Sequence, residues 1–101
     1  MAIHMGKDDD RCKLMIDGRF TFDTYREFLS AIQDRSKLCS HLTIDLTRTE
    51  YLDSSALGLL IQMRERLSSP EKNVLRVKKG SVADEVLTVT NFNKMFQVEV
   101  I

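Results

Sequence analysis

The sequence predicts an α/β fold, a single domain with one mixed β-sheet of four to five strands covered by helices. Short apolar segments that suit strands recur along the chain, and between them lie longer segments whose apolar residues are spaced three and four apart. A length of 101 residues suffices for one compact domain, 1–101, and rarely for two. Strands that alternate with helices pack most economically as a sheet whose face the helices cover.

The first part of the chain predicts a hairpin followed by a helix. Residues 2–5 and 12–16 have the composition of short strands. The polar residues 7–10 suit the turn between these strands, and Asp17-Gly18 is a turn signal that ends the second one. Helical spacing of i, i+3, i+4 and i+7 then places four large apolar side chains on one face: Tyr25, Phe28, Leu29 and Ile32.

The middle of the chain predicts a central strand and a second helix. Residues 42–46, Leu-Thr-Ile-Asp-Leu, form a short apolar set of the kind found in the strands of α/β sheets. From Ser54 the apolar residues return to helical spacing, with Leu60, Met63 and Leu67 on one face. This helix is expected to end near Ser68, before Pro70. A glycine inside a helix costs about 1 kcal/mol relative to alanine, so Gly58 predicts close packing of the helix against a neighbour.

The last part of the chain contains one ambiguous segment. Residues 73–77 predict a strand, 78–80 a turn and 98–101 an edge strand. Between them, the spacing of apolar residues in 82–90 favours a helix, whereas the β-branched run in 86–90 favours a strand. A short helical turn is indicated by three apolar residues at i, i+3 and i+4: Phe92, Met95 and Phe96.

Composition and charge narrow the class of protein. Hydrophobic residues make up 43% of the chain and charged residues 30%, as in ordinary soluble globular proteins. The 15 basic and 15 acidic residues cancel, so no overall field attracts nucleic acid or an anionic membrane. No apolar run approaches the roughly 20 residues of a membrane span, and the first residues lack the apolar stretch of a signal peptide. We therefore expect a cytoplasmic protein that binds neither nucleic acid nor a membrane.

Metal and cofactor sites are not indicated by the sequence. Cys12 and Cys39 are isolated, without the paired spacing of a zinc or redox motif, and are expected to be reduced thiols. The acidic run 8–10 lacks the spaced ligands and the glycine of a calcium loop. We expect neither a metal nor a cofactor.

Residues 51–60, Tyr-Leu-Asp-Ser-Ser-Ala-Leu-Gly-Leu-Leu, are the most informative segment for function. They lead into the predicted second helix, and a helix N-terminus presents free N–H groups and the positive end of the helix dipole. A hydroxyl at such a place can carry a phosphate, and Ser54 and Ser55 supply hydroxyls there. The alternative is that Asp53 or Ser54 only caps the helix, which is the common role of Asp-Ser before an apolar run.

Two motifs resemble the STAS domains of bacterial anti-sigma factor antagonists. Residues 42–46 followed by Asp-Ser-Ser-Ala-Leu-Gly at 53–58 are similar to that family's apolar-Asp-Leu strand and its Asp-Ser-Ser-Gly-Leu-Gly loop. Residues 16–20 resemble the family's strand and glycine turn before the first helix, and 87–96 its last conserved helix and turn. Ala56 replaces the usual glycine and Asn91-Phe92 the usual Gly-Leu. Both replacements fit, because alanine favours a helix and asparagine tolerates the left-handed conformation.

The resemblance implies a STAS fold, with residues 82–90 as a helix, and a partner-switching function. By position the phosphorylation site is Ser54, with Ser55 as the second choice, and the partner-binding residues are Asp53, Ser54, Ser55 and Leu57. The unphosphorylated protein would bind a serine kinase that is also an anti-sigma factor, phosphorylation would release it, and a serine phosphatase would restore binding. The alternative function is that of a STAS accessory or scaffold subunit of a transporter or signalling complex.

A catalytic function is not supported by the sequence. A serine hydrolase needs a base beside the nucleophile and an acid that orients the base. Ser54 does not lie in a Gly-x-Ser-x-Gly motif, and the chain offers only His4 and His41 as histidine bases. We therefore expect a binding protein without catalytic residues.

Overall fold

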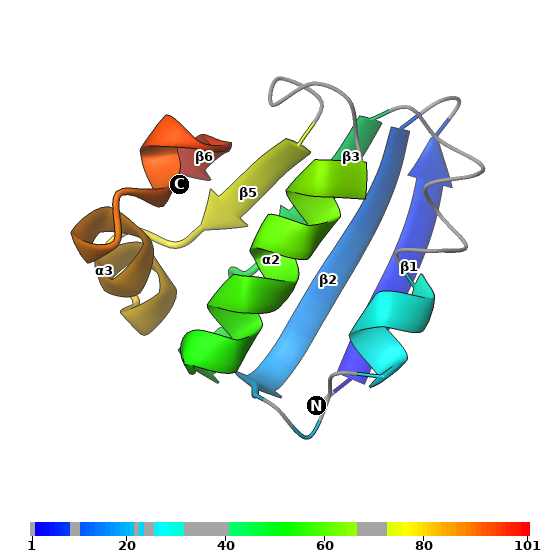
Figure 1. Cartoon of the computed structure of the whole chain (residues 1–101), viewed down its shortest axis with the longest axis horizontal. Helices are drawn as coiled ribbons and strands as arrows, with labels where there is room; N and C mark the ends of the chain where they lie inside the picture. The colour runs from blue at the N-terminus through cyan, green and yellow to red at the C-terminus, as the bar shows by residue number, and fades with distance from the viewer. Residues whose placement is uncertain (1, 9–10, 22, 24–25, 32–40, 67–72) are drawn as a thin grey trace.

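The computed structural model describes residues 2–8, 11–21, 23, 26–31, 41–66 and 73–101, which form one sheet with helices on one face (Figure 1). The six strands are β1 (Ala2–Asp8), β2 (Arg11–Phe20), β3 (His41–Asp45), β4 (Thr49–Leu52), β5 (Asn73–Val77) and β6 (Gln97–Val100). The labelled helices are α2 (Ser54–Arg66), α3 (Val82–Val89) and the 3₁₀ turn η3 (Phe92–Lys94), and residues 26–31 form a further helical segment.

The sheet has the strand order β1-β2-β3-β5-β6, and β4 pairs with the end of β2. β1 is antiparallel to β2, whereas β2, β3, β5 and β6 are parallel neighbours. Crossover connections between parallel strands are almost always right-handed, so a chain that advances in one direction across a sheet keeps its helices on one face. The predicted mixed sheet is confirmed, with β4 as a strand that the sequence did not indicate.

β1 and β2 are longer than predicted. The predicted turn at 7–10 is wrong in its first half, because Lys7 pairs with Cys12 and Asp8 with Arg11. The predicted turn at Asp17-Gly18 is also wrong. Gly18 has a φ of 103°, and the register of β2 shifts between Gly18 and Arg19, so the strand bends there and continues along β4. A bulge uses the same backbone freedom of glycine that a turn uses.

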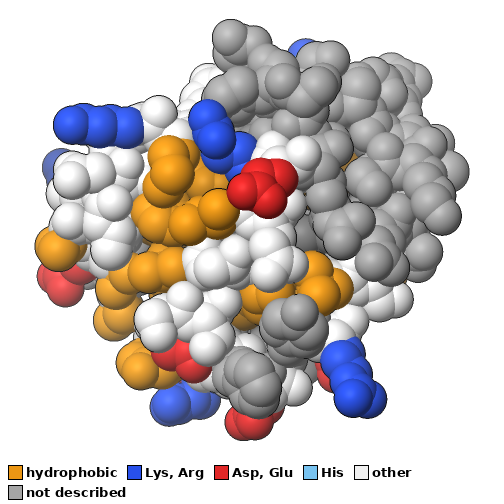
Figure 2. Space-filling view, viewed as in Figure 1, with side chains coloured by type: hydrophobic (Ala, Val, Ile, Leu, Met, Phe, Trp, Pro, Cys, Tyr) orange, Lys and Arg blue, Asp and Glu red, His pale blue; other side chains and the backbone are white. Residues whose placement is uncertain are grey.

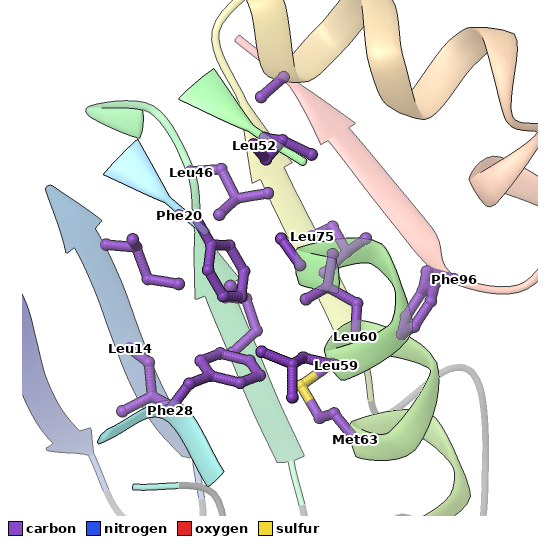
Figure 3. Close-up of a cluster of buried hydrophobic side chains, with 14 of the residues drawn as sticks. Leu14, Phe20, Phe28, Leu46, Leu52, Leu59, Leu60, Met63, Leu75 and Phe96 are labelled. Carbon is purple, nitrogen blue, oxygen red and sulfur yellow. The ribbon is translucent and has the colours of Figure 1, made fainter. Parts of the chain in front are cut away.

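The core lies between the sheet and its helices (Figure 3). The predicted apolar faces of the first two helices are confirmed for Phe28, Leu60 and Met63, which are buried, whereas Tyr25, Ile32 and Leu67 lie outside the described residues. The ring of Phe28 packs against that of Phe20 with 4.7 Å between centroids. α2 is described to Arg66, so its predicted end near Ser68 lies outside the described residues.

The ambiguous segment 82–90 is a helix, as the resemblance implied. The Ser81 side chain caps its start by accepting a hydrogen bond from Asp84 N at 3.1 Å. After its end, Asn91 adopts the left-handed conformation with φ 60°, as expected for the residue in place of glycine. The following turn is tied to α2, because Arg64 Nε donates to the Met95 carbonyl at 2.9 Å.

Cys12 differs from its prediction. Its side chain is 1% exposed on the helix-covered face of β2, and it is disulfide-bonded, so the expectation of a reduced thiol is wrong for this residue. Cys39 lies outside the described residues. Of the helices that the structure describes, none has the length and apolar character needed to cross a membrane.

Gly58 does not pack closely against a neighbour, which contradicts the prediction from its place in a helix. The residue lies on the exposed side of α2, and a Cβ atom built on it would meet nothing within 4 Å. Contact with the sheet therefore does not explain the glycine. Its helix carries the usual entropic cost of glycine without a packing gain inside this domain.

We expect Gly58→Ala to stabilise the protein by about 0.5–1 kcal/mol, because alanine restricts the unfolded chain and fits the open helix surface. Gly80→Ala is the matched control. Gly80 also has open space around its Cβ position but has a φ of 79°, so the same change should destabilise by about 1–2 kcal/mol. Urea unfolding measures both variants, and a destabilised Gly58→Ala protein would contradict the open-surface description.

Candidate functional site

The start of α2 is held by Asp53. Its Oδ1 atom accepts a hydrogen bond from Ala56 N at 2.9 Å, which is the geometry of an N-cap. The Asp53 N–H donates to the Phe20 carbonyl at 3.3 Å, so the cap is tied to the last residue of β2. The capping role that the sequence left open therefore belongs to Asp53.

Ser54 occupies the first position of α2, and its side chain is exposed. Ser55 is half-buried, and Ala56 is buried at 0% exposure, so Ala56 lies on the side of α2 that faces the core, whereas Ser54 lies on the open side. The structure places all four predicted site residues, Asp53, Ser54, Ser55 and Leu57, in the cap and first turn of this helix. Of the two serines, Ser54 presents its hydroxyl more openly to another protein.

A hydrophobic surface lies beside this first turn. Leu57 and Ile61 of α2 are half-buried, Val86 of α3 is half-buried, and Val82 is 43% exposed. Figure 2 shows hydrophobic side chains gathered over α3 and the neighbouring part of α2. Exposed apolar area of this kind, rimmed by polar groups, is typical of surfaces that bind other proteins.

A buried carboxylate that the sequence did not single out positions the segment before the site. Asp45, at the end of β3, is 2% exposed. Its Oδ1 atom accepts hydrogen bonds from Thr47 N at 2.9 Å and Thr47 Oγ1 at 2.6 Å, and its Oδ2 atom lies 3.1 Å from Lys13 Nζ. The aspartate of the apolar-Asp-Leu motif was the signal that could have indicated it.

Hydrogen bonds set the pKa of Asp45. Burial desolvates the carboxylate and by itself raises the pKa, but the two hydrogen bonds from Thr47 and the ion pair with Lys13 together outweigh that effect. The pKa of Asp45 is therefore lowered from its ordinary value. Asp45 is ionised at neutral pH and stabilises the folded state in that form.

The Asp45 turn leads directly to the site. Leu46 N donates to the Arg76 carbonyl at 2.7 Å, and Thr49 N donates to the Leu46 carbonyl at 3.1 Å. Thr49 is itself buried, and its Oγ1 donates to the Ile16 carbonyl at 2.9 Å. These bonds place β4, and β4 ends one residue before Asp53.

The two histidines are not placed to assist Ser54. His41 begins β3 and Asp45 ends it, so the two residues lie four strand positions apart, a distance of about 13 Å. His4 pairs with Met15, on the face of β2 that points away from the buried Leu14 and Ile16, and so away from α2. The described residues do not bring either histidine beside Ser54 as a base.

Comparison with known proteins matches almost the whole chain to one family. The family model described as "Mlab, STAS domain" matches residues 3–98. A STAS-domain containing protein of Pseudomonas aeruginosa (strain UCBPP-PA14) is 26% identical over 91 residues, which is 90% of each chain.

Solved structures of low sequence identity share the fold. An anti-sigma factor antagonist from Mycobacterium paratuberculosis is similar with a TM-score of 0.86 and 19% identity, over 97% of this chain and 84% of that one. The Bacillus cell fate determinant SpoIIAA in its phosphorylated form is similar with a TM-score of 0.72 and 12% identity, over 99% of this chain and 91% of that one. The predicted STAS fold is confirmed.

Replacing Asp45 by asparagine should destabilise the protein by about 1–3 kcal/mol at pH 7, because an amide group then faces Lys13 in place of a carboxylate oxygen. A folded-state pKa below the unfolded value near 3.9 gives stability that is full above that value and is lost as pH falls through the folded one. The gap between wild type and Asp45→Asn should therefore narrow below about pH 4.

Urea unfolding from pH 7 to pH 2.5 measures that gap. Glu50→Gln is the matched control, since it removes a carboxylate charge from the exposed side of β4. A gap that stays constant with pH, or a Glu50→Gln protein that behaves like Asp45→Asn, would contradict the role given to the buried carboxylate.

Proposed function

This chain belongs to the STAS-domain family, and on that premise we propose that it is a partner-switching regulator of the anti-sigma factor antagonist type. In this proposal the unphosphorylated protein binds a serine kinase that is also an anti-sigma factor. Phosphorylation of Ser54 releases that partner, and a serine phosphatase returns the protein to its binding form. The chain acts by binding and supplies no catalytic group.

The exposed hydroxyl of Ser54 in the first turn of a capped helix is the observation that carries the proposal. Because Asp53 makes the capping bond to Ala56 N, modification of Ser54 leaves that bond in place. A kinase reaches an exposed hydroxyl without unfolding the helix, whereas Ser55 is half-buried. Ser54 is therefore the preferred acceptor of the two.

The hydrophobic surface beside Ser54 supplies the binding area for the partner. Leu57 lies one helical turn beyond Ser54, and Ile61 and Val86 continue the apolar area toward α3. A partner that covers this area removes Ser54 and Asp53 from water. The switch residue would then lie within the interface or at its rim.

A phosphate at Ser54 would oppose such an interface electrostatically. It adds about 1.5–2 negative charges at neutral pH, next to the carboxylate of Asp53. A partner must then desolvate two anionic groups, and a penalty of about 2–4 kcal/mol corresponds to about 30- to 1000-fold weaker binding. Such a change is large enough for a switch without refolding.

The fold itself should tolerate the phosphate. The N-terminus of a helix favours negative charge through its free N–H groups and its dipole, and Ser54 lies in that position. The similarity of this chain to SpoIIAA in its phosphorylated form supports the same expectation, because that fold persists with the modification.

An accessory or scaffold subunit without a sigma factor output remains the second function that the family offers. It differs from the switch in one measurable respect. A scaffold subunit binds its partner regardless of the state of Ser54, whereas the switch does not. Binding measurements on Ser54 variants therefore separate the two.

Phosphorylation should add a single phosphate at Ser54, because its hydroxyl is the exposed one in the first turn of α2. The experiment incubates the chain with its bound serine kinase and ATP and maps the phosphopeptide by mass spectrometry. Ser54→Ala should abolish the phosphate and Ser55→Ala should not. A phosphate mainly on Ser55 would assign the site to Ser55 instead. A kinase that binds the chain and leaves it unmodified would contradict a phosphorylation site here.

Binding and stability should respond differently to charge at Ser54. Ser54→Asp should weaken the complex at least tenfold, less than a phosphate does because it carries one charge, whereas Ser54→Ala should bind like the unphosphorylated protein. Capture from a lysate followed by mass spectrometry identifies the partner as the protein whose captured amount changes with the Ser54 variant. Calorimetry then measures the affinity of each variant for that partner. Thermal melting should show all three proteins folded.

Ser55→Asp is the matched control, because it adds the same negative charge to the same helical turn but at the half-buried serine. Equal binding of Ser54→Asp and Ser54→Ala to an identified partner would favour the scaffold function. Loss of the folded structure in Ser54→Asp would instead contradict the electrostatic mechanism.

A further inference from the structure

The face of the sheet opposite the helices carries charged side chains. Burial of alternate residues in β2, β3 and β5 turns the intervening side chains to that face. In the register of the sheet, Asp45 lies opposite Arg76, and Arg76 lies opposite Glu99 of β6. Parallel sheets usually have both faces covered, so the face of these parallel strands that the helices leave uncovered is a candidate binding surface.

A hollow of about 380 Å³ lies on this face. Three cationic side chains, those of Arg11, Lys13 and Arg76, line it together with the Thr43 hydroxyl and one carboxylate, that of Glu99. Gly6 of β1 also lines it and contributes no side chain to fill it. With Asp45, which pairs with Lys13, two carboxylates face these three cations, so one positive charge is left in excess, whereas the charges of the whole chain cancel.

The cations of the hollow differ in how well they are satisfied. Lys13 is matched by Asp45 Oδ2 at 3.1 Å. Arg76 is paired with Glu99 at 3.9 Å between Nε and Oε1, which is too long for a hydrogen bond, and its side chain is 37% exposed. The Nε atom itself is buried and has no hydrogen-bond partner within the described part of the chain. A buried N–H donor without an acceptor is costly, and the group that best satisfies a guanidinium is an oxyanion.

We propose that this hollow binds the oxyanion of phosphate or of a small phosphate monoester. The exposed part of the Arg76 guanidinium and the Thr43 hydroxyl supply donors, and Arg11 and Lys13 supply positive charge. Glu99, whose side chain is 53% exposed, turns to solvent when the anion enters. The site is independent of Ser54, because it lies on the other face of the sheet from α2.

The test titrates inorganic phosphate into the full chain at constant ionic strength and follows backbone amide shifts by NMR. The amides of Gly6, Lys13, Thr43 and Arg76 should move together and saturate. Arg76→Gln should weaken binding about tenfold, since a charge-assisted hydrogen bond is lost. Arg11→Gln should also weaken it, and because Arg11 is exposed this variant keeps the test valid if Arg76→Gln folds poorly.

Lys94→Gln is the matched control, because it removes one positive charge from an exposed residue of η3. The proposal would be overturned if all three variants weakened binding equally, or if chloride at the same concentration competed with phosphate. It would also be overturned if the shifts were confined to Ser54, Ser55 and Ala56. A parallel titration with glycerol 2-phosphate distinguishes the sources. Saturation by the monoester assigns a phosphorylated small molecule, and saturation by inorganic phosphate alone assigns the free ion.

Discussion

The direction in which the chain crosses its sheet determines most of this structure. After β2 the parallel strands are added in one direction, through β3 and β5 to β6, and right-handed crossovers then keep the helices on one face. That face holds the core and the hydrophobic surface beside α2. The opposite face is left to charged side chains, and the carboxyl ends of β3 and β4 lead into the loop and helix that carry Ser54.

Two aspartates, Asp45 and Asp53, hold the two ends of the segment between β3 and α2. Asp45 holds the turn after β3 through Thr47, and Asp53 holds the start of α2 through Ala56 N and the end of β2. Both carboxylates accept backbone N–H groups that the change of direction would otherwise leave without a partner. Ser54 makes neither of these bonds, so the modification proposed above would leave the start of α2 in place.

Residue patterns predicted the elements that have a strong period or a specific motif, and failed where one residue type serves two geometries. The helices at 26–31 and from Ser54, and the strands at 41–45 and 73–77, followed from spacing, although β3 begins and ends one residue before the predicted 42–46. Gly18 predicts a turn because a bulge and a turn both use positive φ. Gly58 predicts a contact because glycine is costly inside a helix, but it lies off the apolar face of α2. β4 has four residues, too few for alternation to indicate a strand.

The register of β2 has a consequence for how the domain acquires its shape. β1 and β2 pair as far as Asp8 opposite Arg11, which are three positions apart in the sequence, so this pair closes a short loop. The parallel pairs close much longer ones, since Arg11 meets His41 and Leu42 meets Asn73, about 30 residues apart in each case. Among the strand pairs, loop-closure entropy therefore favours the β1–β2 hairpin as the first to form, with the later strands added to it.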